Sequence, residues 1–195
     1  MANRDTILAS LKANKPKLID LPFIDAAVFD EQLDLAAEFT KILEVVGGNV
    51  VAVSNDDEIA SHLQNSFSEL PIKYSTIDES YGSIDLETIA NPKDLENLDV
   101  LVLESTIAVA ENGAIWLADK NLPIRVLPFI TKHLAIIISK KDIVPYMHQA
   151  YTKLNNTESD DYGVFISGPS KTADIEQSLV IGAHGALSLT VYLKG

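Results

Sequence analysis

The chain has 195 residues, of which 47% are hydrophobic, and this length and composition predict one domain with a single core. It contains no cysteine, which excludes disulfide bonds, thiol catalysis and an iron–sulfur cluster held by its own thiolates. With 28 acidic and 15 basic residues its net charge is −13, and a field of that sign disfavours binding to nucleic acid or to an anionic membrane.

The negative charge is concentrated in the first half of the chain. Residues 1–100 contain 19 acidic and 7 basic side chains, whereas residues 101–195 contain 9 and 8. The second half is nearly neutral and can still receive an anionic metabolite, because salt screens distant charges over about 8 Å. The sequence shows neither a signal peptide nor an apolar run long enough to span a bilayer, which predicts a cytoplasmic protein.

Residues 1–48 are predicted to form a helical segment that packs on the domain. The glycine pair 47–48 is placed to end the helix. Residues 49–53 are then predicted to form a buried strand, and a second helix follows, because Asn55 and Glu58 have the spacing of a capping box. In the helix that ends at glycines 47–48, the apolar stripe consists of Leu35, Phe39, Ile42 and Val46.

The rest of the chain alternates short apolar runs with helical patterns. The predicted strands are 72–75, 99–103, 114–118, 134–139, 163–167 and 187–193. One helix is predicted to start at Asp142 and another to cover 172–180, whereas 75–97 is acidic and loop-rich. This alternation predicts an α/β domain over 49–195, with an open, mostly parallel twisted sheet and flanking helices. Ligands in such folds collect after the strands, at their carboxyl ends.

The most specific polar segment follows the predicted strand 163–167. A tight turn leads into a predicted helix N-terminus, where unpaired N–H groups, two hydroxyls and the Lys171 ammonium can hold a carboxylate or phosphate. Alternatively, a hydroxyl only caps the helix and an acidic side chain complements its dipole. The residues of this candidate binding segment are Gly168, Pro169, Ser170, Lys171, Thr172 and Asp174.

Glu111 is the second candidate, because it interrupts two apolar runs. A buried carboxylate is costly without a partner, so Glu111 is either exposed in a turn or placed there for chemistry. The following pair, Asn112-Gly113, is typical of a two-residue hairpin turn and supports the structural interpretation.

Two histidines are candidate functional residues. His184 lies in Gly182-Ala-His184-Gly185, where glycines permit close backbone approach and an imidazole can act as acid, base or donor near neutral pH. A structural role is the alternative. His133, just before an apolar strand, is a weaker candidate, and the other histidines are interpreted as surface or packing residues. The sequence shows no nucleotide-binding glycine motif and no metal-binding pattern, so no metal site is predicted.

Together these residues resemble the lactate utilization protein C family, also called the LUD domain. Segment 166–176, followed by 180–185 and a closing strand, is similar to the terminal signature of that family. Ala110-Glu-Asn-Gly113, Arg125-Val-Leu-Pro128 and His133 occur in the expected order. This chain departs from the usual family pattern at Asn112, Ala114, Lys171 and Ala186.

The resemblance implies a fold similar to the sugar-phosphate isomerase and CoA-transferase superfamily. It also implies a role in oxidising L-lactate to pyruvate beside iron–sulfur subunits, which would hold the clusters because this chain has no cysteine. Our leading hypothesis is a subunit that binds a small carboxylate or phosphorylated metabolite. Lys171 and backbone N–H groups would hold the anion, and His184 or Glu111 would exchange a proton at its hydroxyl-bearing carbon. Asn112, Gly113 and Gly185 join the candidate binding segment.

Two other functions stay open. The first is a standalone CoA or acyl transferase, or a sugar-phosphate isomerase-like enzyme, because Ala110-Glu-Asn-Gly113 resembles the segment that supplies the glutamate nucleophile of CoA transferases. The second is a non-catalytic assembly module whose acidic first half docks on a basic partner. A homo-oligomer is compatible with any of these hypotheses.

Overall fold

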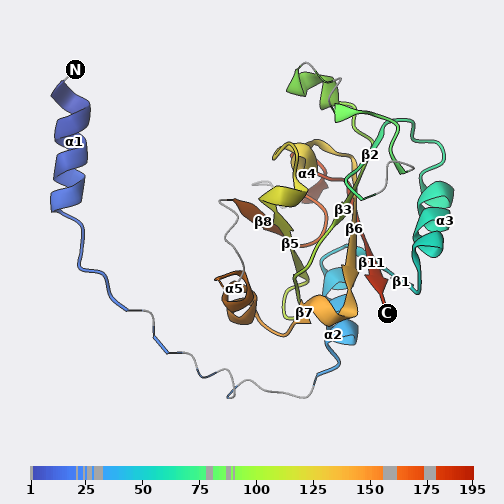
Figure 1. Cartoon of the computed structure of the whole chain (residues 1–195), viewed down its shortest axis with the longest axis horizontal. Coiled ribbons are helices and arrows are strands. Elements are labelled where there is room, and N and C mark those ends of the chain that lie inside the picture. The colour runs from blue at the N-terminus through green and yellow to red at the C-terminus, as the bar shows by residue number, and fades with distance from the viewer. Residues whose placement is uncertain are drawn as a thin grey trace. The chain divides into compact units, whose positions relative to one another are not determined.

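A five-stranded parallel sheet forms the centre of the fold (Figure 1). In this computed structural model the sheet order is β1 (Asn49–Val53), β11 (Ser188–Lys194), β6 (His133–Ser139), β3 (Val100–Glu104) and β2 (Lys73–Ser75). All neighbouring pairs are parallel. The structure describes residues 2–20, 22–23, 25, 28, 33–77, 81–86, 89, 91–155, 162–173 and 179–195.

The central strand β6 shows why this sheet is buried on both faces. Leu134, Ile136 and Ile138 belong to one hydrophobic core, whereas Ala135 and Ile137 belong to the core on the opposite face. Successive side chains of a strand point to opposite faces, so a strand between two covered faces is apolar throughout. The continuous apolar run that predicted this strand is therefore explained by its position.

One face of the central sheet is covered by α3 (Asp56–Ser66). Its buried Ile59 and Leu63 side chains pack in that core. The predicted capping is present at its start: Asn55 Oδ1 accepts from the N–H of Glu58 at 3.0 Å. The Glu58 carboxylate accepts in turn from the N–H of Ser54 at 2.8 Å, one residue earlier than in a standard capping box.

The other face carries α2 (Leu35–Val45) and a second sheet. Phe39 and Leu43 of α2 are buried, and the helix contacts both β1 and β7. The second sheet has the order β7 (Ile143–Val144), β4 (Ala108–Val109), β5 (Ala114–Ala118) and β8 (Gly163–Ile166). Helix α5 (Met147–Asn155) packs on β4 and β7.

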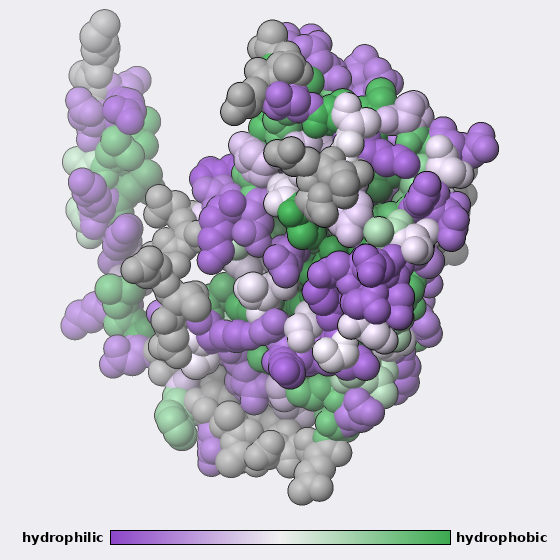
Figure 2. Space-filling view, turned by 45° about the vertical axis from the view of Figure 1, so that its right-hand side comes forward, coloured by the Kyte–Doolittle hydropathy of each residue, from purple (hydrophilic) through white to green (hydrophobic). Residues whose placement is uncertain are grey.

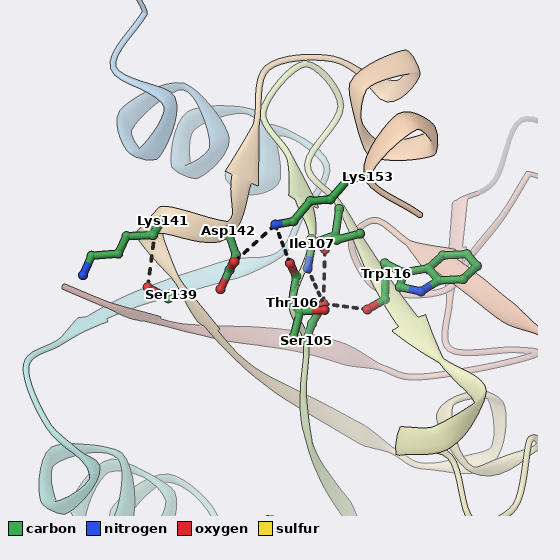
Figure 3. Close-up of polar contacts among 8 residues, drawn as sticks. All are labelled: Ser105, Thr106, Ile107, Trp116, Ser139, Lys141, Asp142 and Lys153. Atoms are coloured by element: carbon green, nitrogen blue, oxygen red, sulfur yellow. Dashed lines mark hydrogen bonds and ion pairs between the residues drawn. The ribbon is translucent and has the colours of Figure 1, made fainter. Parts of the chain in front are cut away.

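Polar contacts fix the crossing between the two sheets (Figure 3). Ser105 is buried just after β3, and its hydroxyl donates to the carbonyl of Trp116 at 2.6 Å. Lys153 of α5 donates to the Thr106 carbonyl at 3.0 Å and lies 3.2 Å from an Asp142 carboxylate oxygen. These contacts hold α5 and the strands of the second sheet in place beside the central one.

Two predicted helices differ from the structure. The helix expected from Asp142 begins only at Met147, because Lys140–Asp142 forms a 3-10 turn (η6) and the following β7 pairs with β4. The helix expected over 172–180 is wrong. Instead β9 (Lys171–Ala173) and β10 (Leu179–Ile181) pair antiparallel, and β-branched residues such as Thr172 and Val180 favour this extended backbone.

The remaining elements are short, apart from the N-terminal helix α1 (Ala2–Ala13). The chain forms two compact units, residues 1–31 and 32–195. Within the first unit, Ile7, Leu8 and Leu11 of α1 are exposed. The assignment of 1–48 as one segment packing on the domain stays a prediction. The short elements are η4 (Pro92–Leu95), η5 (Asp119–Asn121) and α4 (Leu127–Ile130).

The predicted fold class is confirmed: the domain is α/β, with a mostly parallel central sheet, flanking helices and a helix near the N-terminus. None of the helices in the described ranges has the length and apolar character needed to cross a bilayer.

Candidate functional site

The candidate segments follow strands of the second sheet. Strand β4 is parallel to β7 and antiparallel to β5, which is itself antiparallel to β8, so β4, β7 and β8 all run in one direction. Their carboxyl ends therefore share one edge. The turn 110–113 follows β4, Pro145 follows β7, and the loop 167–170 follows β8.

Contacts join these segments to one another. The Ser167 hydroxyl donates to the Asn112 carbonyl at 2.7 Å, which connects the loop after β8 to the turn after β4. The N–H of Glu111 donates to the Pro145 carbonyl at 3.1 Å, so the chain leading into α5 lies along the same turn. The turn itself has four residues between β4 and β5, rather than the predicted two.

Two glycines allow this edge to approach the C-terminus of α2. Gly113 and Gly168 both have positive φ angles, 65° and 72°. A Cβ on Gly113 would lie 3.1 Å from the Leu43 Cα, and a Cβ on Gly168 would lie only 2.6 Å from the Val46 carbonyl oxygen. Any other residue type at position 168 would force the loop away from α2.

Lys171 also lies against the end of α2. Its Nζ is 3.3 Å from the position that a Cβ on Gly47 would occupy. The carbonyl groups at a helix C-terminus favour a nearby cation, so this placement suits the ammonium without a carboxylate partner. The sequence analysis assigned Gly47 only to the end of the helix. Its second role, which is to leave space for the Lys171 side chain, depends on a contact between residues far apart in the sequence.

The turn that contains His184 lies beside the candidate binding segment. The N–H of Ser170 donates to the Ala186 carbonyl at 2.9 Å, and the N–H of Gly182 donates to the Ser170 carbonyl at 2.9 Å. A Cβ on Gly185 would lie 3.0 Å from the Ser170 Cβ. The backbone of residues 182–186 is thus held against Ser170, and His184 is exposed at the tip.

These placements change the predicted anion cradle. There is no helix N-terminus at residue 171, and the Ser170 N–H is already bonded to Ala186. Thr172 is exposed in the two-stranded ribbon, and Asp174 lies outside the described residues. An anion would therefore be held by the Lys171 ammonium and the Ser170 hydroxyl rather than by helix N–H groups.

Three exposed side chains remain available on these adjoining segments: Glu111, Lys171 and His184. Within the described part of the chain, none of the three forms a side-chain hydrogen bond or ion pair. Asn112 is different, because its side-chain oxygen accepts from the N–H of Ala114 at 3.0 Å and stabilises the turn. Pro169 is buried and shapes the loop.

The sequence missed the contribution of residues 145–148. They were assigned to a helix starting at Asp142, but the extended backbone at β7 brings Pro145 to Glu111. Tyr146 follows at once, and its ring stacks on His148 with centroids 5.6 Å apart. The only sequence signal was the proline, which interrupts the predicted helix.

A second polar cluster lies at the amino ends of β3 and β6. The Asp99 carboxylate is 2.7 Å from the Lys132 ammonium and accepts from the N–H of Ile72 at 3.0 Å. Burial raises the pKa of Asp99, but the hydrogen bonds from Lys132 and Ile72 outweigh this effect and lower it overall. His133 Nδ1 is 2.8 Å from the Ser188 hydroxyl, and burial lowers the pKa of this imidazole.

Two grooves lie elsewhere on the domain. One of about 560 Å³ lies between α3 and strands β2 and β3, and one of about 970 Å³ surrounds the segment after β2. Neither is lined by Glu111, Lys171 or His184. Among the described residues there is no group of three or more His, Asp or Glu side chains arranged to hold a metal ion.

Comparisons with known proteins identify relatives of this chain. The sequence model of the LUD domain matches residues 85–193. Lactate utilization protein C from Geobacillus thermodenitrificans is 28% identical over 192 residues, which cover 95% of this chain and 77% of that protein. Lactate utilization protein C from Bacillus pumilus is 38% identical over 97 residues, 47% of this chain and 40% of that protein.

A solved structure supports the fold. The crystal structure of a DUF162 family protein from Deinococcus radiodurans matches with a TM-score of 0.56 and 15% sequence identity, covering 89% of this chain and all of that one. The LUD match spans more than half of the chain and includes the segments that carry Glu111, Lys171 and His184. The chain belongs to the LUD domain family.

Proposed function

We propose that this protein takes part in the oxidation of L-lactate to pyruvate in the cytoplasm, binding a small carboxylate or phosphorylated metabolite at the edge formed by β4, β7 and β8. The names of its relatives support the pathway. The observation that carries the site is a set of three exposed side chains, Glu111, Lys171 and His184, on segments that contact one another. None of the three forms a hydrogen bond or ion pair with the described residues.

In this proposal the Lys171 ammonium binds the carboxylate or phosphate of the ligand, and the Ser170 hydroxyl donates to it. A charge-assisted hydrogen bond of this kind is stronger than one between neutral groups. Lysine provides a single point charge here, without the paired donors of arginine. One ammonium and one hydroxyl therefore suit a small anion that presents one oxygen to each.

Oxidation of a hydroxyl-bearing carbon to a carbonyl removes two protons and two electrons. We assign acceptance of the protons to His184 and Glu111. General acid–base catalysis of this kind raises the reaction rate by roughly 10²–10⁴-fold. The electrons would pass to partner proteins that carry iron–sulfur clusters. This chain has no cysteine to ligate such a cluster, so any cluster would have to be held by the partners.

The test reconstitutes lactate oxidation from iron–sulfur proteins that co-purify with this chain, with and without it. We expect the rate to fall when the chain is omitted, and Lys171→Gln to reduce binding of the anion in calorimetric titrations. Lys140→Gln, which removes an exposed lysine from the end of β6, is the matched control. An unchanged rate on omission would refute the role.

A second function is favoured by one observation: Glu111 is an exposed carboxylate in a glycine-containing turn. Such a carboxylate can attack the thioester of an acyl-CoA and expel the CoA thiolate, which leaves an acyl-glutamyl anhydride. The thiolate then attacks the glutamyl carbonyl, so that the acyl group leaves as a free carboxylate and a glutamyl-CoA thioester remains. Incubation with an acyl-CoA followed by hydroxylamine would then leave a modified Glu111, detectable by mass spectrometry. The absence of that adduct in folded protein, with Glu111→Gln as the blank, would remove this function.

A further inference from the structure

A groove lies beside β2 and β3, next to the core that α3 covers on one face of the central sheet. Its volume is about 560 Å³, within the size range of small-molecule sites. Its apolar lining includes Leu63 of α3, Phe67 at the C-cap of that helix, and the half-buried Leu70, over a floor made by the buried Val100 and Val102 of β3. On the side of the molecule where α3 lies, Figure 2 shows hydrophobic surface between hydrophilic side chains.

Lys73 is the one charged residue among the described residues that line this groove. It is the first residue of β2 and pairs in register with Val100, and side chains paired across a sheet lie on the same face. Lys73 therefore lies on the face that carries the apolar lining. It is half-buried, and no carboxylate of the described residues forms an ion pair with it.

The wall next to Lys73 is fixed by the backbone. The Ser83 hydroxyl donates to the Pro71 carbonyl at 2.6 Å and accepts from the N–H of Lys73 at 2.9 Å. The N–H of Ser83 donates to the Lys73 carbonyl at 2.8 Å. The segment around Ser83 is thus held along the free edge of β2, so the groove has a preformed side rather than an open one.

We propose that this groove binds an amphiphilic monocarboxylate, with its carboxylate on the Lys73 ammonium and its aliphatic chain against Leu63, Phe67 and Leu70. A half-buried cation that has no carboxylate partner among the described residues favours a ligand that brings one negative charge. A phosphate dianion is less suited, because it needs several donors around it. The site is separate from the edge that carries Glu111, so the inference does not depend on the proposed function.

A lysine on an edge strand has a simpler explanation, which is to prevent pairing with another sheet. The two explanations differ in what they predict for ligand binding. An edge-protecting lysine contributes nothing to ligand binding, so removing its charge changes the affinities for a carboxylate and for the corresponding alcohol by the same factor. A lysine that contacts the ligand raises the affinity for the carboxylate only. Removing the Lys73 charge then lowers the affinity for the carboxylate and leaves the affinity for the alcohol unchanged.

The experiment titrates the full-length chain with hexanoate, octanoate and octanol in a calorimeter. We expect octanoate to bind, and each methylene added between hexanoate and octanoate to improve the affinity by about four-fold. Lys73→Gln should lower the affinity for octanoate by about five-fold, because a partly exposed ion pair is worth up to about 1 kcal/mol. The affinity for octanol should stay unchanged. Lys140→Gln is the control for loss of one surface charge.

A second variant tests the apolar part of the site. Ala60 lines the groove from α3, so Ala60→Phe fills it and should abolish binding of octanoate and octanol alike. Its folding is checked by circular dichroism before titration. The proposal is overturned if octanoate does not bind the wild-type chain, if Lys73→Gln weakens the binding of octanol as much as that of octanoate, or if Lys73→Gln and Lys140→Gln behave identically.

Discussion

The two polar regions of this domain differ in how their side chains are partnered. At the amino ends of β3 and β6, Asp99 is bonded to Lys132 and to a backbone N–H, and His133 is bonded to Ser188. At the carboxyl edge of β4, β7 and β8, the backbone is held by hydrogen bonds and close glycine contacts. The side chains of Glu111, Lys171 and His184 there form no hydrogen bond or ion pair with the described residues.

This difference separates a stabilising region from a candidate binding region. A buried charge needs partners to offset the loss of hydration, so Asp99 and its contacts contribute to folding. A charge that stays exposed on a rigid loop contributes little to folding but is free to meet a ligand. The carboxyl edge of β4, β7 and β8 combines the two properties that a binding site requires, a fixed backbone and available side chains.

The largest expected effect comes from the backbone of the candidate site. Gly168→Ala would place a Cβ 2.6 Å from the Val46 carbonyl at a φ of 72°, so the loop must move away from α2. We expect a loss of about 2–3 kcal/mol in the free energy of unfolding, measured in urea. Gly195→Ala, where the nearest atom is the Lys140 ammonium at 4.0 Å, is the control and should change nothing.

The next effect comes from the paired region. Asp99→Ala removes a nearly buried carboxylate and leaves the Ile72 N–H and the Lys132 ammonium without their acceptor. We expect a loss of about 2 kcal/mol, because hydrogen bonds to charged groups contribute about 1.5–3 kcal/mol. Lys132→Gln should cost less, since that side chain is about half exposed. Equal losses for both variants would contradict the assignment of Asp99 as the buried partner.

The same region should also make stability depend on pH in two windows. Burial lowers the pKa of His133 below its ordinary value of 6.5, so the unfolded chain binds a proton more readily and stability falls as the pH drops below about 6.5. The pKa of Asp99 is lowered from 3.8, so its contribution is present above that pH and is lost as the pH falls through the lower, folded value.

Urea unfolding of wild type and His133→Gln between pH 7.5 and 5 tests the first window. The variant should lose less stability on acidification than the wild type does. Asp99→Asn tests the second window, because its difference from the wild type should shrink below about pH 4. Parallel pH profiles for all three proteins would refute both assignments.

The sequence predicted most strands of this fold because burial on two faces leaves a plain signal, as in residues 134–138 of β6. The ribbon at 171–181 was missed, because Ser170, Thr172 and Asp174 also fit a helix start and only tertiary pairing decides between the two. The close approach of Gly168 to α2 could not be predicted from the sequence either, because it joins residues more than a hundred positions apart.

The smallest expected effect is the most informative one for the candidate site. Glu111→Gln, Lys171→Gln and His184→Asn remove groups that make no side-chain bonds among the described residues, so each should change the free energy of unfolding by no more than about 0.5 kcal/mol. If Lys171→Gln instead costs more than 1 kcal/mol, the ammonium serves mainly to stabilise the C-terminus of α2, and the proposed anion site loses its cation.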